Sequence, residues 1–472
     1  MKIGIVGAGW AGLSAAVRLK SYGHRITVFE ASDTPGGRAR RVADPKLGNI
    51  DNGQHLMLGA YTETLALIRM LHPNVPPDAL LRRSALQLAS LDGQFVMQAG
   101  ILPSPLSLLA AMLFAKGLGL ADKWRAVSML ARLKRNGWAC SDDWSVGQLL
   151  THHHQTPATC QWLWHPLCIA AMNTPIGEAS AQVFLNVLKD SFDAAPEHAD
   201  LIVPRVDLSA LWPDAATSGL DMRWRHVVRR VVARDHQVDI DGEAFDYVIV
   251  ATPPYAASRI LGLSVREDDP ETLASPDDPL NTLRQTLDVF RYLPITNITL
   301  GLVDACDRRG EMWMLDEQPS LGHVGQWVFF HESGKEIRVV ISAPDAQVVE
   351  TDHASLARMV YDQVCTQIKR GRIKRGRLAS KQPSTNLNSL DQRSTSPLPA
   401  LGSFRVLTEK RATFACTTTL VRPSNQTPWP RLLLAGDWTH SPYPAVLEAA
   451  VRSGKRAAEL IQACEENRLG NV

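Results

Sequence analysis

The sequence predicts an α/β fold, and three observations carry this prediction. An apolar strand at residues 3–6 runs into a glycine-rich turn at 7–12 and then into a helical pattern, and a second apolar strand ends at Glu30. Two more buried-type strands, at 247–250 and 432–434, each end in a turn. Long helical and mixed stretches separate these pieces. The pattern therefore predicts a Rossmann-like dinucleotide-binding domain interleaved with an α+β domain.

The first turn is the most specific of these signals. It reads Gly7-Ala8-Gly9-Trp10-Ala11-Gly12. Gly7 permits the tight turn, Gly9 lets a pyrophosphate approach the backbone, and Gly12 lets the helix pack on the strand. The helix N-terminus attracts the phosphates, and Glu30 can accept a hydrogen bond from a ribose hydroxyl. A preceding strand, a following helix and an acid at the expected distance make this a strong dinucleotide signal.

Two further elements bear on which dinucleotide is bound. Gly36, Gly37 and Arg38 follow the Glu30 strand directly and can wrap the same pyrophosphate from the other side. Near the C-terminus, the strand at 432–434 leads into Ala435-Gly436-Asp437-Trp438 and then a helix from about Val446. A nicotinamide enzyme has no evident need for either element.

Together with the strand and turn at 247–254, these pieces resemble, in the same order, the FAD-binding elements of the amine oxidase and phytoene desaturase superfamily. The resemblance implies FAD rather than NAD as the cofactor. It also implies that Asp437 hydrogen-bonds near the ribityl chain or pyrophosphate of the flavin. The alternative is that Asp437 caps the segment that follows it.

A narrower resemblance lies in Asp51-Asn52-Gly53-Gln54-His55 and in the segments at 166–175 and 200–209. These are similar to the squalene-associated FAD-dependent desaturases, and the similarity runs over essentially the whole chain. It implies reduction of hydroxysqualene, an allylic C30 alcohol, to squalene in hopanoid and squalene biosynthesis, by hydride transfer from reduced flavin. The electron donor is not readable from the sequence.

The resemblance also assigns a set of residues to the cofactor. We expect FAD to contact Gly7, Ala8, Gly9, Ala11, Gly12, Glu30, Gly36, Gly37, Arg38, Asn52, Gly53, Gln54, His55, Val228, Ala251, Gly436, Asp437, Val446 and Leu447.

Three other functions compete with this one. A carotenoid or polyprenyl desaturase would share the cofactor and fold but run in the oxidative direction. A flavin amine oxidase usually places an aromatic residue just before the glutamate of its last helix, whereas this chain has Val446 two positions before Glu448. A flavin-binding or lipid-carrying protein without catalysis would show no substrate-dependent redox change.

A poor leaving group such as hydroxyl needs a general acid near neutral pH. His55 is the first candidate, because histidine titrates near working pH and this one should lie near the flavin. Its structural alternative is a hydrogen bond to the backbone. Asp51 is the second candidate, although it can equally anchor its loop, and His165 is a weaker third.

The FAD-binding pieces predict a discontinuous domain made of residues 1–60, 216–260 and 405–472. The substrate-binding domain then consists of residues 61–215 and 261–404. The first of these insertions reads as largely helical, with helices at 62–71, 106–118, 120–133 and 179–192. The second mixes strands at 295–302, 325–330 and 336–343 with a helix at 355–368.

Composition argues against nucleic-acid binding, a disulfide framework and a metal site. The chain has 472 residues, is 45% hydrophobic and 21% charged, and has a formal net charge of +2, which gives no general attraction to nucleic acid. Its 7 scattered cysteines fit reduced thiols in a cytoplasm better than a disulfide framework. No metal site is expected, since the adjacent residues His152, His153 and His154 cannot converge on one ion and read as a polar loop.

The most apolar stretch, near 106–118, falls short of the ~20 apolar residues that a membrane span needs. One interpretation is a buried helix of the substrate domain. The other is a membrane-facing helix that dips into one leaflet, with Lys116, Lys123 and Arg125 at the headgroups. The resemblance implies a hydrophobic C30 isoprenoid and the upstream enzymes of the squalene pathway as partners, with peripheral contact to the cytoplasmic membrane as a further expectation.

Overall fold

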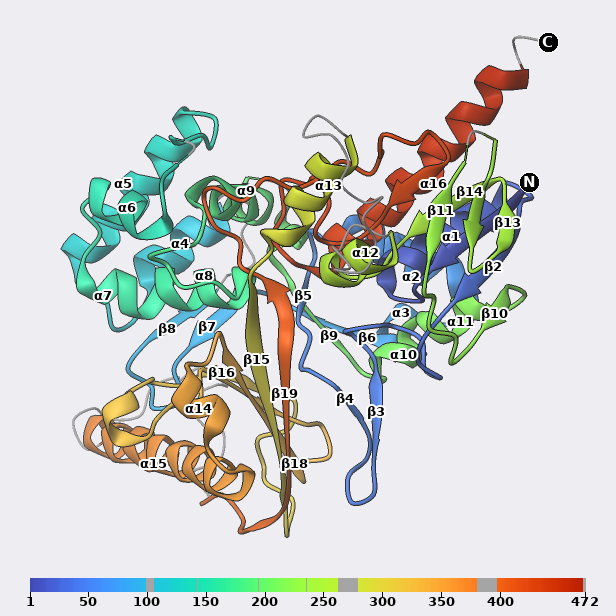
Figure 1. Cartoon of the computed structure of the whole chain (residues 1–472). Coiled ribbons are helices and arrows are strands. Elements are labelled where there is room, and N and C mark those ends of the chain that lie inside the picture. Colours follow the sequence, from blue (N-terminus) through green and yellow to red (C-terminus); the bar gives the residue numbers. More distant parts are fainter. Residues whose placement is uncertain are drawn as a thin grey trace.

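The computed structural model describes residues 1–98, 106–141, 143–193, 195–234, 236–261, 279–379 and 397–469. Figure 1 shows three regions: a parallel sheet with its helices, a helical lobe, and an antiparallel sheet covered by a long helix. The α/β fold class predicted from the sequence is confirmed.

The parallel sheet joins pieces that are far apart in the sequence. Its central strands are almost wholly buried, which suits the continuous apolar runs that form them. All four pairings between neighbouring strands are parallel. In spatial order the strands are β10 (Asp221–Arg223), β2 (Arg25–Phe29), β1 (Lys2–Val6), β14 (Tyr247–Val250) and β20 (Leu432–Leu434).

The helices α1 (Trp10–Ser21) and α16 (Leu447–Leu469) pack closely against each other beside this sheet. A β-carbon on Gly454 of α16 would lie only 2.1 Å from the carbonyl oxygen of Ala11, so only glycine allows this approach. The Ser14 hydroxyl donates to the carbonyl of Val451 at 2.9 Å. The first and last long helices of the chain are therefore locked together.

The antiparallel sheet carries its own apolar core, which includes Ile298, Val339 and, from the covering helix, Val360. Its long strands β15 and β19 reach toward the parallel sheet (Figure 1). The strands in spatial order are β16 (Met312–Met314), β17 (Trp327–Phe330), β18 (Glu336–Ser342), β15 (Tyr292–Leu302) and β19 (Leu401–Phe414). The accompanying helices are α14 (Ala346–Glu350), α15 (His353–Ala379) and the 3₁₀ turn η4 (Pro319–Leu321).

The helical lobe, drawn at the left of Figure 1, comes from the first insertion. Its apolar residues form one buried cluster with the ends of β15 and β19. The elements are α4 (Leu106–Phe114), α5 (Leu120–Arg135), α6 (Val146–His152), α7 (Pro157–Thr159), the π-helix η1 (Cys160–Trp164), α8 (His165–Met172) and α9 (Ala181–Phe192).

One predicted helix is shorter than its pattern indicates. The apolar run at 106–118 predicts a single helix, whereas α4 ends at Phe114. Lys116 then forms a bridge to Val96, with its N–H donating to the Val96 carbonyl at 2.8 Å. Gly117 adopts a φ of +90° next to the carbonyl of Gln94. The glycine turn ends the helix, because residues with a side chain rarely adopt this φ.

Short elements connect the three regions. The small strands pair as β3 (Arg41–Asp44) with β4 (Gly48–Asp51), β7 (Gln87–Ala89) with β8 (Val96–Gln98), β5 (Met57–Leu58) and β6 (Leu81–Ser84) with β9 (Leu201–Pro204), and β11 (Val231–Ala233) with β12 (Val238–Ile240) and β13 (Glu243–Phe245). The remaining helices are α2 (Thr62–Leu71), α3 (Pro77–Leu80), η2 (Pro196–Ala199), α10 (Leu208–Leu211), α11 (Pro213–Thr217), α12 (Pro254–Ile260) and α13 (Pro279–Asp288).

Candidate cofactor site at the carboxyl edge of the parallel sheet

The turn between β1 and α1 shows why three glycines stand there. Gly7 has a φ of +107°, and its β-carbon would lie 2.9 Å from the Ala251 carbonyl. A β-carbon on Gly12 would lie 2.0 Å from the Gly7 carbonyl. Gly9 differs, since its β-carbon would meet only the Gly37 Cα, at an ordinary 3.9 Å. Protein packing therefore requires Gly7 and Gly12, whereas the open space at Gly9 suits a ligand that approaches the backbone.

The N-terminus of α1 is prepared for an anion. Its N-cap residue Gly9 provides no side-chain cap, and the first turn contains no acidic residue. The first backbone N–H groups of a helix lack partners within the helix, and its dipole is positive at this end. A phosphate group is the natural partner for such an end, and Ala8 and Ala11 belong to the same turn.

Glu30, at the end of β2, lies next to this turn. Its carboxylate accepts hydrogen bonds from the backbone N–H of Ala8 at 2.7 Å and of Ser32 at 2.8 Å. A carboxylate offers about four acceptor positions, so these two bonds orient the group and leave capacity for ribose hydroxyls.

The Gly-Gly-Arg loop closes against the glycine turn. The Gly36 N–H donates to the Ala8 carbonyl at 2.9 Å, and Gly37 takes a φ of +62° beside Gly9. Arg38 donates to Asp437 at 2.6 Å and to the Ala412 carbonyl at 2.7 Å. Burial alone would lower the pKa of the Arg38 guanidinium, but Asp437 raises it above the usual range, so Arg38 stays cationic. The loop thus brings a fixed positive charge to the site.

The segments around Ala251 and Gly436, which come later in the sequence, complete the candidate site. Ala251 donates its N–H to the Val6 carbonyl at 2.8 Å, and Trp438 donates to the Thr252 carbonyl at 3.1 Å. Gly436 is held by the Ser453 hydroxyl, which accepts its N–H at 2.9 Å. Further along the chain Val446 and Leu447 stand at the start of α16. Val228 is buried in the segment between β10 and β11.

These residues fit a dinucleotide. Among the described residues, the Thr252 hydroxyl is buried and has no hydrogen-bond partner in the protein. Its backbone nitrogen adjoins the glycine turn, 3.6 Å from where a β-carbon on Gly7 would lie, and its carbonyl accepts the Trp438 N–H. The same turn offers a helix N-terminus without a side-chain cap and an open glycine. Polar groups that are buried without partners are costly, so a ligand that satisfies them stabilises the site.

The comparisons with known proteins agree with this geometry. Residues 10–462 match the model of the flavin containing amine oxidoreductases. The chain belongs to this family. Its members bind FAD, and the chain is therefore an FAD-dependent oxidoreductase.

Three relatives show which members of the family the chain is similar to, and over how much of its length. Hydroxysqualene dehydroxylase from Zymomonas mobilis is 26% identical over 467 residues, which cover 97% of this chain and 98% of the relative. The enzyme from Sinorhizobium fredii is also 26% identical, with 97% of each chain covered. Zeta-carotene desaturase from Solanum lycopersicum is 33% identical over only 69 residues, or 15% of this chain and 12% of the relative.

Two solved structures share the fold at low identity. An oxidoreductase from Methanosarcina mazei superposes with a TM-score of 0.66 at 13% identity, covering 97% of this chain and 100% of the other. Putrescine oxidase superposes with a TM-score of 0.65 at 16% identity, covering 98% and 99%. These neighbours establish the fold of this flavin family for the chain.

The segment after the Gly-Gly-Arg loop is held in place at several points. The Asn52 amide donates to the Arg38 carbonyl and accepts from the Arg40 N–H at 3.1 Å, so this side chain orders the loop. The Gln54 N–H donates to Asn297 of β15 at 3.0 Å. A β-carbon on Gly53 would lie 3.2 Å from the side chains of Asn297 and His55, so a larger residue would require these side chains to shift.

Asn297 and Arg338 are functional candidates that sequence analysis missed. Arg338 of β18 donates to the Gln54 side chain at 3.3 Å and lies 3.8 Å from the Asp51 carboxylate. Their signal in the sequence is weak, because each is one of several polar residues in its strand. Only the pairing of β15 with β18 brings them to the 51–55 segment.

The two proton-donor candidates differ in their electrostatics. Burial lowers the pKa of His55, and its Nδ1–H donates to the Gly53 carbonyl at 2.9 Å. Burial raises the pKa of Asp51 to about 6, although the Leu208 N–H, which donates at 2.8 Å, opposes this shift. Near neutral pH, His55 is therefore mainly neutral, and Asp51 holds its proton far longer than an exposed carboxyl does.

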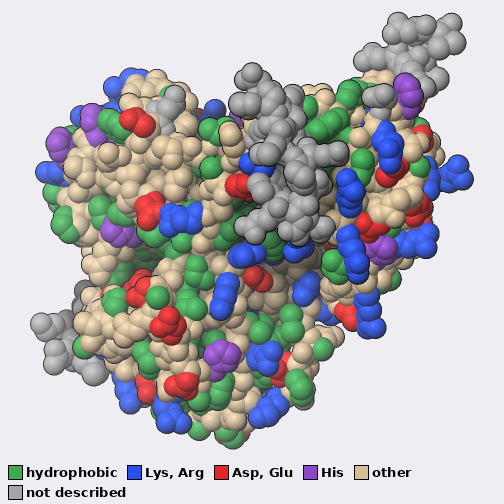
Figure 2. Space-filling model, in the orientation of Figure 1, with side chains coloured by type: hydrophobic (Ala, Val, Ile, Leu, Met, Phe, Trp, Pro, Cys, Tyr) green, Lys and Arg blue, Asp and Glu red, His purple; other side chains and the backbone are tan. Residues whose placement is uncertain are grey.

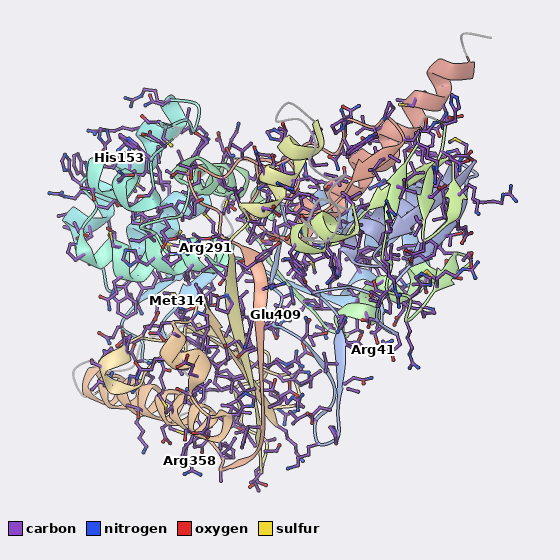
Figure 3. All side chains as sticks on the ribbon, viewed as in Figure 1. Arg41, His153, Arg291, Met314, Arg358 and Glu409 are labelled. Atoms are coloured by element: carbon purple, nitrogen blue, oxygen red, sulfur yellow. The ribbon has the colours of Figure 1, made fainter. Side chains whose placement is uncertain are left out.

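The other histidines lie elsewhere. His165 is exposed at the start of α8. His153 lies in the helical lobe, away from Arg41 and Glu409 near the two sheets (Figure 3). No metal-binding group of three or more side chains occurs among the described residues. Likewise, none of the described helices is both long and apolar enough to cross a membrane.

Asp51 yields a prediction about stability. Its folded-state pKa of about 6 lies above the ordinary 3.8, so its proton stabilises the fold below pH 3.8, and this stabilisation is lost as the pH rises through about 6. The loss amounts to about 3 kcal/mol. In urea unfolding at pH 4 and pH 7, Asp51→Asn should show a smaller decrease in unfolding free energy than the wild type. Equal decreases in both proteins would contradict the assignment.

Proposed function

We propose that the chain reduces hydroxysqualene to squalene, with FAD as its redox cofactor. The observation that carries this proposal is the full-length similarity to hydroxysqualene dehydroxylases, which covers 97% of the chain. The similarity to a zeta-carotene desaturase spans 15% of it. Carotenoid or polyprenyl desaturation is the second candidate, because it needs the same cofactor and the same apolar surroundings.

Two features of the chain support an apolar substrate. The buried cluster of the helical lobe continues to Phe290, Phe414 and Trp438. The Phe290 ring meets the rings of Phe414 and Trp438 edge to face, with centroid distances of 5.6 and 6.1 Å. Figure 2 shows a hollow with hydrophobic side chains between the helical lobe and the antiparallel sheet. A C30 chain offers only its hydroxyl as a polar handle, so its affinity comes from buried apolar area at about 25 cal/mol per Å².

The reaction replaces a C–OH bond with a C–H bond and releases water, which consumes two electrons and two protons. FAD, when bound and reduced, supplies the electrons. The residues of the chain hold the substrate in a dry cavity and deliver a proton to the leaving hydroxyl. His55 and Asp51 are the proposed proton carriers, with Asn297 and Arg338 as positioning residues for the segment that bears them.

If His55 is the acid, only its protonated form can act. Because burial lowers its pKa, this form decreases as the pH rises through the neutral range, and turnover should decrease with it. His55→Ala should keep FAD bound, slow turnover by a factor on the order of 10² to 10⁴ and remove this pH dependence. Steady-state rates from pH 6 to pH 8 test this. An unchanged rate would remove His55 from the mechanism.

The deciding experiment on function is anaerobic. The purified protein is reduced with dithionite and mixed with hydroxysqualene, while flavin absorbance and lipid products are followed. Reoxidation of the flavin together with formation of squalene is the expected result. If oxidised protein is instead bleached by squalene or phytoene, the desaturase is correct. If neither lipid changes the flavin, an amine substrate or a non-catalytic carrier role replaces both.

A further inference from the structure

An exposed apolar surface lies where α4 meets α5. Phe114 is 83% exposed and Leu113 50% exposed at the end of α4, and Leu120 is 86% exposed and Trp124 68% exposed in the first turns of α5. We call these four residues the α4–α5 corner. Large apolar side chains exposed singly are ordinary, whereas a contiguous group marks a contact surface.

The folding of the two helices does not require this corner. α4 already buries Ala111 and Met112 in the lobe, and α5 buries Ala126, Met129 and Leu133. A surface helix normally presents polar residues on its other face. The four corner residues are therefore apolar although the described part of the chain leaves them exposed, and they add little to the core.

The charged residues that adjoin the corner in the sequence are mainly basic. Between residues 106 and 125 the sequence has three basic residues, Lys116, Lys123 and Arg125, and a single acid, Asp122. Asp122 is already engaged, since it accepts the N–H of Gly119 at 2.8 Å. Lys123 reaches over to the Leu113 carbonyl at 2.8 Å, so its ammonium stands at the edge of the corner.

We propose that the α4–α5 corner docks on the surface of an anionic lipid bilayer. Phenylalanine and leucine enter the acyl boundary, tryptophan lies at the interface, and lysine and arginine meet the phosphate headgroups. The contact is peripheral, in line with the lack of a spanning helix among the described residues. Its purpose rests on the proposed function, because a C30 lipid substrate resides in membranes and not in water.

Vesicle flotation of the FAD-loaded full chain, without substrate, tests the docking. Wild type should float with mixed phosphatidylcholine–phosphatidylglycerol vesicles and much less with pure phosphatidylcholine. The double variant Phe114→Ser with Leu120→Ser should lose binding by on the order of tenfold. The control is Val303→Ser with Leu321→Ser, two apolar residues near the antiparallel sheet that are also largely exposed (58% and 59%), and it should bind like wild type.

Each other outcome overturns the proposal. If both double variants float equally, the protein binds vesicles through another surface. If wild type binds both vesicle types equally, anionic lipid is not required for binding. A corner variant that changes the sedimentation of the protein but not its flotation shows that a second copy covers the corner. Retained flavin absorbance confirms that the variants fold. Because no turnover is measured, failure here is distinguishable from failure of the dehydroxylase proposal.

Discussion

Replacing Gly12 with alanine should abolish FAD binding. Its β-carbon would lie 2.0 Å from the Gly7 carbonyl and 3.2 Å from the Ala251 side chain, and the first of these contacts is with rigid backbone. The turn can accept a methyl group only by opening, which moves the N-terminus of α1 away from the place where it meets the pyrophosphate. The measurement is the ratio of flavin to protein absorbance after purification.

Gly9→Ala is the matched control for this variant. The protein leaves room for its β-carbon, so the flavin-free form of Gly9→Ala should melt like flavin-free wild type, even though the methyl group intrudes on the ligand. Flavin-free Gly12→Ala should melt at a lower temperature. A Gly12→Ala protein with a full complement of flavin would refute the assignment of this turn.

Replacing Glu448 with alanine should cause a large loss of stability. Its buried carboxylate accepts the N–H groups of Glu63 and Thr64 at 3.0 and 2.9 Å and the Thr64 hydroxyl at 2.7 Å. These N–H groups belong to the first turn of α2, whose own N-cap residue makes no side-chain cap. Alanine would leave them buried without partners, at a cost of about 3–5 kcal/mol in unfolding free energy.

Arg452→Ala provides the comparison. Arg452 donates to Glu448 at 2.7 Å, but its side chain is 39% exposed and solvent screens the pair. Its loss should cost about 1 kcal/mol or less, because the carboxylate keeps its other three donors. Urea unfolding measures both variants. Equal destabilisation would mean that the ion pair, and not the capping of α2 by α16, holds these helices together.

Much of the fold follows from local patterns. The helix predicted at 62–71 coincides with α2, and the strands predicted at 295–302 and 336–343 match β15 and β18 to within three residues. Such elements carry a clear periodicity. The first insertion, predicted as largely helical, also contains strands β6, β7, β8 and β9, which have three or four residues each. Strands this short leave almost no periodicity to detect, and β9 finds its partners far away in the sequence.

The residues of the candidate site likewise fall into those that the sequence reveals and those that it does not. Gly7, Gly12, Glu30 and the Gly-Gly-Arg loop are recognisable because each acts through the backbone geometry of its own segment. Asn297 is not, because its role depends on where β15 lies relative to Gln54. Likewise, the opposite pKa shifts of His55 and Asp51 arise from burial, which spacing in the sequence does not reveal. The catalytic roles and the domain boundaries therefore stay predictions.

The pairing of Arg38 with Asp437 has a consequence for biosynthesis. These partners lie 399 positions apart, and Ser14 and Val451 lie 437 apart. The glycine turn is synthesised before the strand and helix that close it, so the FAD site cannot be complete until both parts have been synthesised. Until then the N-terminal strands lack the neighbours that complete their sheet.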